Sequence, residues 1–306
     1  MALYEILGVT EFILSHEPAV RLSFFFGVFA LIALWEIGAP RRALTVPKTQ
    51  RWTANLDIVV LNTVMLRLLF PAAAAGMALF GQHHGWGVFN YFQTPDWLAV
   101  LVSVIVLDFA IYLQHVMVHA VPALWRLHRV HHADLDYDVT TGVRFHPIEI
   151  VLSMLIKFAV IAVLGPPPLA VVVFEVLLNA TALFNHGNVG LPSELDRVLR
   201  WFLVTPDMHR VHHSVEDDET NSNFGFSLPW WDRLCGTYRD QPRAGHPGMS
   251  IGIRGYRDPK QVDRLPGMLT LPFIGQVSDY AINRRQWGEH DERKSSKVTG
   301  NPSDLS

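Results

Sequence analysis

Residues 96–132 read DWLAVLVSVIVLDFAIYLQHVMVHAVPALWRLHRVHH, an apolar stretch that leads directly into a group of histidines. The part from Trp97 to about Leu113 is near the length of a membrane-spanning helix. His115 and His119 follow four residues apart, which places both rings on one face of a continuing helix. The stretch therefore predicts a pair of metal-ligand side chains at one end of a transmembrane helix.

The histidine pattern continues along the chain. Two triplets share the form His-x-x-His-His, and each places its rings on one face if the segment is helical. The pair and the two triplets are called the histidine boxes below. Imidazole is the commonest side-chain metal ligand, and the boxes hold more histidines than one catalytic zinc needs. We therefore predict a site for two metal ions. His186 is added as a ligand, and His146 as either a ligand or a helix cap. The predicted ligands are His115, His119, His128, His131, His132, His146, His186, His209, His212 and His213.

Composition indicates a membrane protein and excludes several other classes. Of the 306 residues, 50% are hydrophobic and 17% are charged, respectively above and below the averages of soluble proteins. The net charge of -3 is too small to indicate nucleic-acid binding, so no nucleic-acid partner is expected. Cys235 is the single cysteine, which excludes a disulfide framework within the chain and a cysteine-ligated zinc or iron–sulfur site.

Five apolar runs predict an all-α integral membrane bundle. Three are expected to span the membrane, and the last two form a helical hairpin, because the prolines between them stop one helix and set a reversal. The runs cover about 22–37, 56–80, 97–113, 148–164 and 169–184. We divide the chain into an N-terminal segment (1–18), a membrane-embedded catalytic domain (19–240) and a polar C-terminal region (241–306) with a disordered tail from about Glu289.

The charges in the loops predict the orientation of the bundle. The segment after the first run carries Arg41, Arg42, Lys48 and Arg51, and residues 120–147 carry further arginines. The intervening loop, 81–96, contains no lysine or arginine. By the positive-inside rule, the histidine boxes and the C-terminus then lie on the cytosolic side, on a helical cap that carries the metal site.

Three charged residues within the apolar runs need an explanation. Asp108 lies seven residues before His115, about 10 Å along the helix, too far to reach that ring. We expect its carboxylate to orient a metal-bound histidine from another helix. Lys157 and Glu175 each lie nine residues from Pro166, so the hairpin would place them at similar depth. Two charges in lipid are tolerated when paired, which predicts a structural ion pair.

The boxes resemble those of a known family. Residues 124–132 (LWRLHRVHH), 205–214 (TPDMHRVHHS), 223–225 (NFG) and 231–238 (WDRLCGTY) are similar to the sterol desaturase/fatty acid hydroxylase superfamily over about residues 20–240. The resemblance implies a membrane enzyme whose histidines hold two iron ions, with O2 as co-substrate and electrons from an external donor. Val116 departs from the family pattern, in which arginine often follows the first box histidine, but it is not a predicted ligand.

Three functions remain open at this stage. The first is a di-iron oxidoreductase that hydroxylates or desaturates a sterol, fatty acyl or related lipid. The second is a zinc-dependent membrane hydrolase, and the third is a metal carrier or transporter, because imidazole suits iron, zinc, copper and nickel alike. The chain lacks a dinucleotide-binding fingerprint, so a separate ferredoxin, cytochrome or reductase would supply electrons to the oxidoreductase. A basic patch for that donor, or for lipid headgroups, would contain Arg126, Arg129, Arg200 and Arg210.

Overall fold

The computed structural model describes residues 2–275, and every regular element in this range is a helix, which confirms the predicted all-α class. The longer helices are α1 (Ala2–Ser15), α2 (Glu17–Gly38), α3 (Lys48–Leu69), α4 (Ala73–His83), α6 (Asp96–Ala120), α7 (Pro122–His132), α8 (Pro147–Leu164) and α9 (Pro168–Asn185). The shorter ones are α5 (Val88–Tyr91), η1 (Thr141–Val143), α10 (Ser193–Leu199), α11 (Pro206–His212), α12 (Asp217–Thr220), α13 (Trp230–Cys235), α14 (Gly245–Gly248), α15 (Pro259–Val262), α16 (Leu265–Thr270) and η2 (Leu271–Phe273).

Five helical segments are long and apolar enough to cross a membrane, in agreement with the predicted bundle. They are α2, the stretch 48–91, α6, α8 and α9. The second apolar run was predicted as one continuous segment, but it is divided between α3 and α4. Pro71 follows the end of α3 and lacks the N–H that an uninterrupted helix needs, which accounts for the break.

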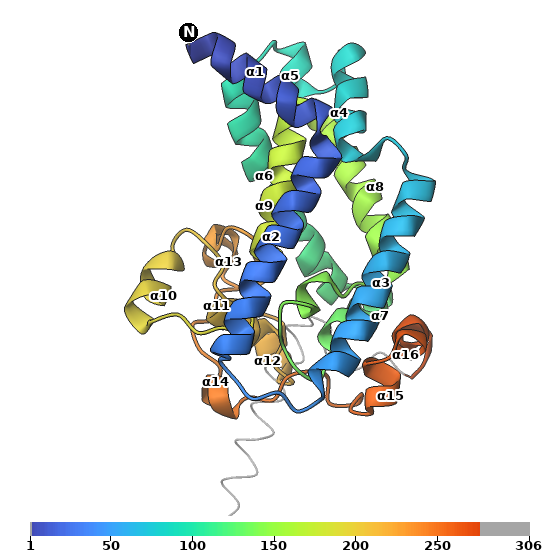
Figure 1. Ribbon diagram of the computed structural model, residues 1–306, viewed down its shortest axis with the longest axis vertical. Helices are drawn as coiled ribbons and strands as arrows, with labels where there is room; N and C mark the ends of the chain where they lie inside the picture. Colours follow the sequence, from blue (N-terminus) through green and yellow to red (C-terminus); the bar gives the residue numbers. More distant parts are fainter. Residues whose placement is uncertain (1, 276–306) are drawn as a thin grey trace, which may run out of the picture.

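Helix α9 lies at the centre of the bundle. It packs against α2 on one side and against α6 and α4 on others, while α8 lies beside α3 and α4 (Figure 1). Its core contacts are apolar: Val171 and Phe174 lie in one buried cluster with Leu107 and Ile111 of α6 and Ile161 of α8. The most deeply packed span is therefore the one whose lower end carries His186.

The hairpin between α8 and α9 turns at a glycine, as the Gly-Pro-Pro-Pro sequence predicts. Gly165 has φ +65°, the left-handed conformation that ends many helices without strain in glycine. Gly87 also has a positive φ and touches this turn so closely that a Cβ on Gly87 would clash with the backbone of Gly165, and a Cβ on Gly165 with the Trp86 carbonyl oxygen. Asn90 donates from Nδ2 to the Gly165 carbonyl at 3.2 Å, which joins α5 to the hairpin.

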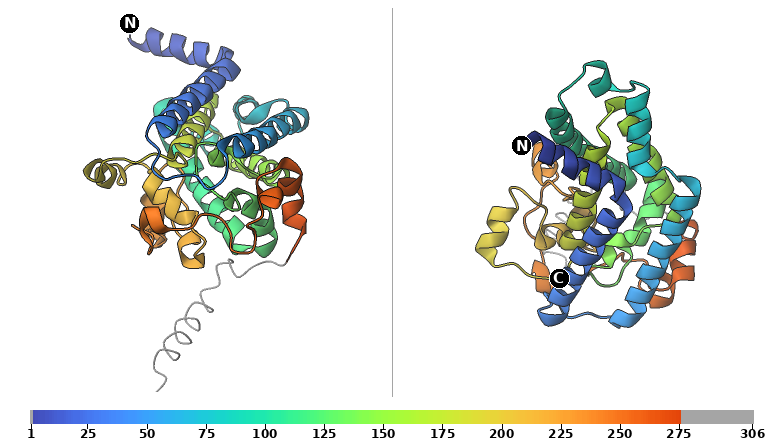
Figure 2. Two further views of the ribbon diagram at one scale, coloured as in Figure 1. Left: turned by 60° about the horizontal axis from the view of Figure 1, so that its bottom comes forward. Right: turned by 45° about the horizontal axis from the view of Figure 1, so that its top comes forward.

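The cap gathers at the opposite end of the bundle (Figures 1 and 2). There α7 and α16 share a buried cluster with α3 that includes Ile58, Trp125, Val130 and Met268. Residues 241–275 thus pack against the preceding helices, although we predicted a polar region there. The proposed boundaries at residues 18 and 240 stay predictions, and the predicted tail lies outside the described residues.

The charges within the hairpin are paired. Lys157 Nζ lies 2.6 Å from Glu175 Oε1, which confirms the predicted ion pair between α8 and α9. A third partner was not predicted: Arg21 of α2 lies 3.1 Å from Glu175 Oε2. The triplet joins three helices around one buried carboxylate.

Candidate metal centre

Four segments bring histidines to one place where the bundle meets the cap. The last turns of α6 carry His115 and His119, and α7 and α11 each carry one triplet, ending at or next to the last residue of the helix. His186 caps the C-terminus of α9. Pro122 and Pro206 begin α7 and α11, a position that suits proline because the first helical N–H needs no partner. Helices α7 and α11 therefore each start a short distance before their histidine triplet.

Nine histidines form two buried groups. The first group contains His115, His119, His128, His132 and His212, and the second contains His131, His186, His209 and His213. Within each group the candidate ligand atoms all lie within 4.8 Å of one another. The groups share a wall, since the rings of His132 and His213 stack with centroids 4.6 Å apart. The arrangement is that of two adjacent nitrogen-lined cages.

The imidazole tautomers indicate that the cages suit cations. His115 Nδ1 lies 2.8 Å from the Phe224 carbonyl oxygen, and His128 Nδ1 lies 2.6 Å from Glu149 Oε1. Because those oxygens accept, each Nδ1 carries the hydrogen and each Nε2 of the neutral ring presents a lone pair. The two Nε2 atoms are only 3.2 Å apart. Facing lone pairs repel unless a cation lies between them.

The same geometry recurs in both cages. His119 and His132 approach through their Nε2 atoms at 3.2 Å, and so do His186 and His131. Metal–imidazole bonds of about 2.0–2.1 Å place neighbouring donor atoms about 3 Å apart, so these separations fit pairs of ligands on one ion. Several further ring nitrogens are buried with no hydrogen-bond partner within residues 2–275, among them both nitrogens of His209 and of His213. The residues present therefore fit two metal ions.

The outward-facing nitrogens are held by fixed acceptors. His212 Nδ1 donates to the Ser222 carbonyl at 2.7 Å, and His186 Nδ1 donates to the Ala182 carbonyl at 2.8 Å. His119 Nδ1 lies 3.2 Å from Asn221 Oδ1. Metal-bound histidines usually give their second N–H to such acceptors, which fixes the tautomer and turns Nε2 toward the ion.

The imidazoles outside the spans are neutral at physiological pH. Burial, followed by the neighbouring imidazoles, lowers the pKa well below its usual value for His131, His132, His209, His212 and His213. Burial also lowers the pKa of His186 to about 4. Only the neutral ring can bind a metal, so burial favours the protonation state that ligation needs.

A loop after the third box closes the site. The Asp232 carboxylate accepts hydrogen bonds from the backbone N–H groups of Phe224 and Gly225, both at 2.8 Å, and from Thr237 Oγ1 at 2.7 Å. Burial raises the pKa of Asp232 to about 6. The loop presents the Phe224 ring to His115 and His119, with centroids 5.5 and 5.1 Å away. Asp232 thus positions the Phe224 ring, which covers the first cage.

A comparison with protein families agrees with this geometry. The family model for fatty acid hydroxylases matches residues 100–237, the range that contains all nine clustered histidines. Over this range the chain is similar to the sterol desaturase/fatty acid hydroxylase superfamily, in agreement with the resemblance of the histidine boxes. Together with the five apolar helices, this similarity supports a multi-pass membrane protein.

Curated relatives from the superfamily share about a quarter to a third of the aligned residues. Ornithine lipid hydroxylase OlsE of Rhizobium tropici is 30% identical over 61% of this chain and 54% of its own length. Alkylglycerol monooxygenase of Homo sapiens is 30% identical over 50% of this chain and 34% of its own length. Cholesterol 25-hydroxylase of Rattus norvegicus is 25% identical over 47% and 48%, respectively. The chain spans about half the length, or less, of these relatives. No solved structure matches it significantly.

One predicted ligand lies outside both cages. His146 is the N-cap of α8: its Nδ1 accepts from the Ile148 N–H at 3.2 Å, and its Nε2 lies 3.3 Å from the Leu269 carbonyl. Of the two roles considered for it, the structure supports the cap. The reason is local: Pro147 starts a helix there, and the N–H of Ile148 in its first turn needs an acceptor.

Asp108 does not orient a histidine, contrary to our expectation. Its Oδ2 accepts from Trp231 Nε1 at 2.8 Å and from the Leu228 N–H at 3.3 Å. The segment that follows Phe224 folds back along α6 and takes the position that a neighbouring histidine would have needed. Asp108 therefore anchors the closing loop.

Residues that the sequence analysis undervalued complete the site. Glu149, to which the sequence analysis assigned no role, bonds directly to His128. Tyr137 was not considered: its hydroxyl donates to the Asn185 carbonyl at 2.6 Å, and its ring stacks on His186. No motif marks either contact. The folding of residues 133–149 back under α7 produces both.

The suggested basic patch is wrong for three of its four arginines. Arg129, Arg200 and Arg210 are buried, with 0%, 3% and 0% of their surface exposed. Arg129 donates to the carbonyls of Leu271 and Ile274, and Arg210 pairs with Asp207. They bind protein groups within the cap and cannot together form a docking surface.

Proposed function

We propose that this protein is a membrane-bound oxidoreductase that uses two iron ions, O2 and external electrons to hydroxylate a lipid. Desaturation would be an alternative outcome, because both reactions begin by removing a hydrogen atom from the lipid. The observation that carries the proposal is the pair of buried cages in which neutral imidazoles face one another through unprotonated nitrogens 3.2 Å apart. Bound iron would supply the O2 activation that attack on an unactivated C–H bond requires.

The roles of the protein residues follow from their contacts. Glu149, and the backbone carbonyls of Phe224, Ser222 and Ala182, hold imidazole hydrogens on the outer nitrogens and so fix ring orientation. Phe145 lies against His131 with ring centroids 4.6 Å apart. Together with Phe224, it limits the access of water to the cages. A dry, rigid donor set protects a reactive oxidant from side reactions.

The substrate we propose is a lipid with a long hydrocarbon segment. The names of these relatives refer to an ornithine lipid, an alkylglycerol and cholesterol, which share an extended apolar body and a polar end. Such a molecule would lie in the bilayer with the reacting carbon toward the cages. We further propose that the histidine side of the membrane and the C-terminus are cytosolic, where a separate ferredoxin, cytochrome or reductase can deliver electrons.

The test combines metal analysis with product analysis. The purified full-length protein should contain about two iron ions per chain, as counted by elemental analysis. Cells that express it should accumulate a lipid that has gained one oxygen atom, labelled when 18O2 is supplied. A lipid that has lost two hydrogens instead would identify a desaturase. Bound zinc with O2-independent turnover would support a hydrolase, and metal binding without lipid conversion would support a carrier.

A further inference from the structure

Helices α10 and α13 and the residues after α10 present an apolar surface to the outside of the molecule. We call this surface the α10–α13 patch, and its side chains are between 39% and 76% exposed. Two tryptophans and a phenylalanine contribute to it, and the segments are joined because Trp230 Nε1 donates to the Trp201 carbonyl at 2.7 Å. The patch consists of Leu195, Val198, Trp201, Phe202, Trp230 and Leu234.

The patch lies at a depth that the bilayer reaches. The segment before α13 contacts the middle of α6, where the Leu228 N–H and Trp231 Nε1 both donate to Asp108. Asp108 precedes the end of α6 by twelve residues, about 18 Å of helix. Ser227 Oγ also lies 3.0 Å from Thr181 Oγ1, four residues before the end of α9, about 6 Å inside that span. Figure 1 shows α10 and α13 beside the lower parts of α2 and α9. With the spans in a bilayer, exposed aromatic side chains at this level would face lipid.

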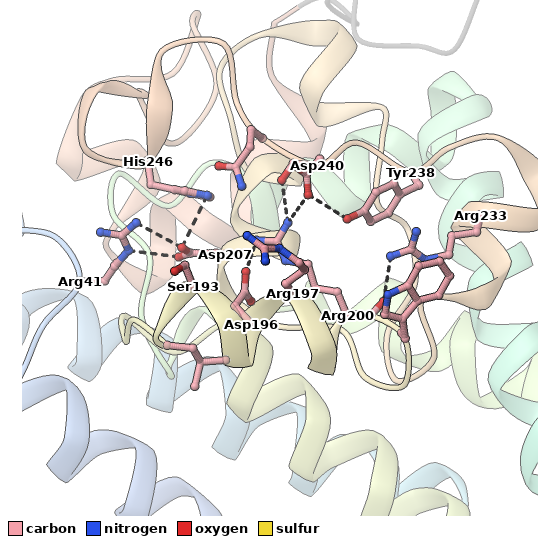
Figure 3. Close-up of a pocket in the computed structure, with 13 residues that line it drawn as sticks. Arg41, Ser193, Asp196, Arg197, Arg200, Asp207, Arg233, Tyr238, Asp240 and His246 are labelled. Carbon is pink, nitrogen blue, oxygen red and sulfur yellow. Dashed lines mark hydrogen bonds and ion pairs between the residues drawn. The ribbon is translucent and has the colours of Figure 1, made fainter.

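A polar pocket of about 530 Å³ opens beside the patch; Trp201 belongs to both, and Arg233 of α13 lines the pocket. Figure 3 shows Arg41 and His246 at one end and Tyr238 and Arg233 at the other. The carboxylates in its wall are engaged: Asp207 pairs with Arg41 at 3.2 Å, and Arg200 lies 2.6 Å from Asp196 and 3.0 Å from Asp240.

Arg233 differs from the other arginines of the pocket. Its guanidinium lies over the rings of Trp201 and Tyr238, 4.1 Å from each centroid. Its Nη2 donates to the Arg200 carbonyl at 3.1 Å, and its Nε is buried without a hydrogen-bond partner among the described residues, as is the Nε of Arg200. A cation stacked between aromatic rings at the edge of an apolar surface suits an anion that arrives attached to a hydrocarbon chain.

We propose that the pocket binds the headgroup of an anionic phospholipid while the acyl chains lie along the α10–α13 patch. Aromatic side chains and arginines together are typical of the membrane–water interface. An acidic soluble protein would match the charge of Arg233 but not six apolar side chains at the depth of the spans. The site is separate from the cages, and the proposal does not depend on the oxidoreductase function.

The natural cysteine provides the test, because Cys235 is exposed at the end of α13 and is the single cysteine of the chain. The full-length protein, labelled there with a fluorophore, is placed in nanodiscs of phosphatidylcholine with a minor fraction of phosphatidylglycerol. Bromine, a contact quencher, is carried on the acyl chains of one lipid or the other. We expect quenching by both lipids, and several-fold more quenching per molecule by brominated phosphatidylglycerol.

Two variants test whether Arg233 causes the preference for the anionic lipid. Arg233→Gln should bring the two quenching efficiencies to within about twofold of each other, whereas Arg233→Lys should retain a preference for the anionic lipid. Arg243→Gln removes an exposed cap charge outside the pocket and should change nothing. Equal quenching by both lipids in the unaltered protein would overturn the anionic site. Absence of quenching by either lipid would show that α13 lies in water, as would a fluorophore that responds to an acidic protein but not to lipid.

Discussion

Individual histidines at the cages should control separate ions. His212 belongs to the first cage and His131 to the second. We expect His212→Ala and His131→Ala each to abolish turnover and to remove about one bound ion per chain, because each leaves its cage one donor short. Elemental analysis and a lipid assay check this. His146→Ala is the matched control: it should cost about 1 kcal/mol through the lost helix cap and leave the metal content unchanged. Full activity in either cage variant would refute the ligand assignment.

Glu149 should tune the first cage without being a ligand. The Gln side chain of Glu149→Gln can still accept from His128 Nδ1 but loses the negative charge that strengthens this hydrogen bond. Loss of such a partner typically weakens metal binding about 10–100-fold, so we expect a decrease of about tenfold, measured by competition with a chelator. Asp207→Asn is the comparison, because Asp207 contacts arginines rather than a cage histidine. Equal metal affinities in the Glu149 variant and the unaltered protein would contradict this role.

Metal-ligand residues were predictable where histidines recur at a helical spacing. The boxes reveal ligands because two rings on one helical face can reach one ion. Glu149 and Asp232 could not be assigned roles, since their partners are determined by the fold. His128 is 21 residues from Glu149, and the carbonyl that orients His115 is 109 residues away. Asp108 was misassigned because helical periodicity gives its face on α6 but not which loop covers that face.

At the level of helices, the buried charge triplet should matter for stability rather than turnover. Glu175 lies between Lys157 and Arg21 and is nearly inaccessible to solvent. Glu175→Gln leaves Lys157 without its counter-ion and Arg21 with Glu17 as its remaining carboxylate partner, and breaking a buried pair typically costs about 3–5 kcal/mol. We expect a lower melting temperature in detergent and a lower yield, with normal turnover per folded molecule. Glu194→Gln, at a side chain 77% exposed, should cost less than about 1 kcal/mol. Selective loss of turnover at a normal melting temperature would place Glu175 in the reaction instead.

The helices themselves were predictable from apolar runs of membrane length. The proline-linked hairpin and the depth match of Lys157 with Glu175 followed from counting residues on either side of Pro166. The division of the second run at Pro71 was missed because its apolar composition continues through the break. The packing of residues 253–274 against α3 and α7 was also missed, since short helices of mixed polarity carry no strong periodic pattern.

For the molecule as a whole, metal ions should couple the cap to the bundle. The cages draw histidines from α6, α7, α9 and α11, so bound ions join two spans to two cap helices. Removing the metal with a chelator should lower the melting temperature and increase hydrogen exchange at residues 128–132 and 209–213 more than in α8. Adding iron back should reverse both effects. An unchanged melting temperature in protein shown to have lost its metal would mean that the cages are rigid without ions.

The predicted orientation of the protein in the membrane rests on loop arginines, some of which are buried in the folded structure. Arg51 and Arg144, which support a cytosolic cap, are fully buried and paired with Asp134 and other cap residues. Membrane insertion responds to the unfolded loops, before these pairs form, so the positive-inside rule still applies to them. A reporter that is active only in the cytosol should therefore be active when fused to the C-terminus and inactive when inserted between Gly85 and Thr94, in the loop without lysine or arginine. The reverse pattern would place the histidine cages on the outer side, where no cytosolic electron donor could reach them.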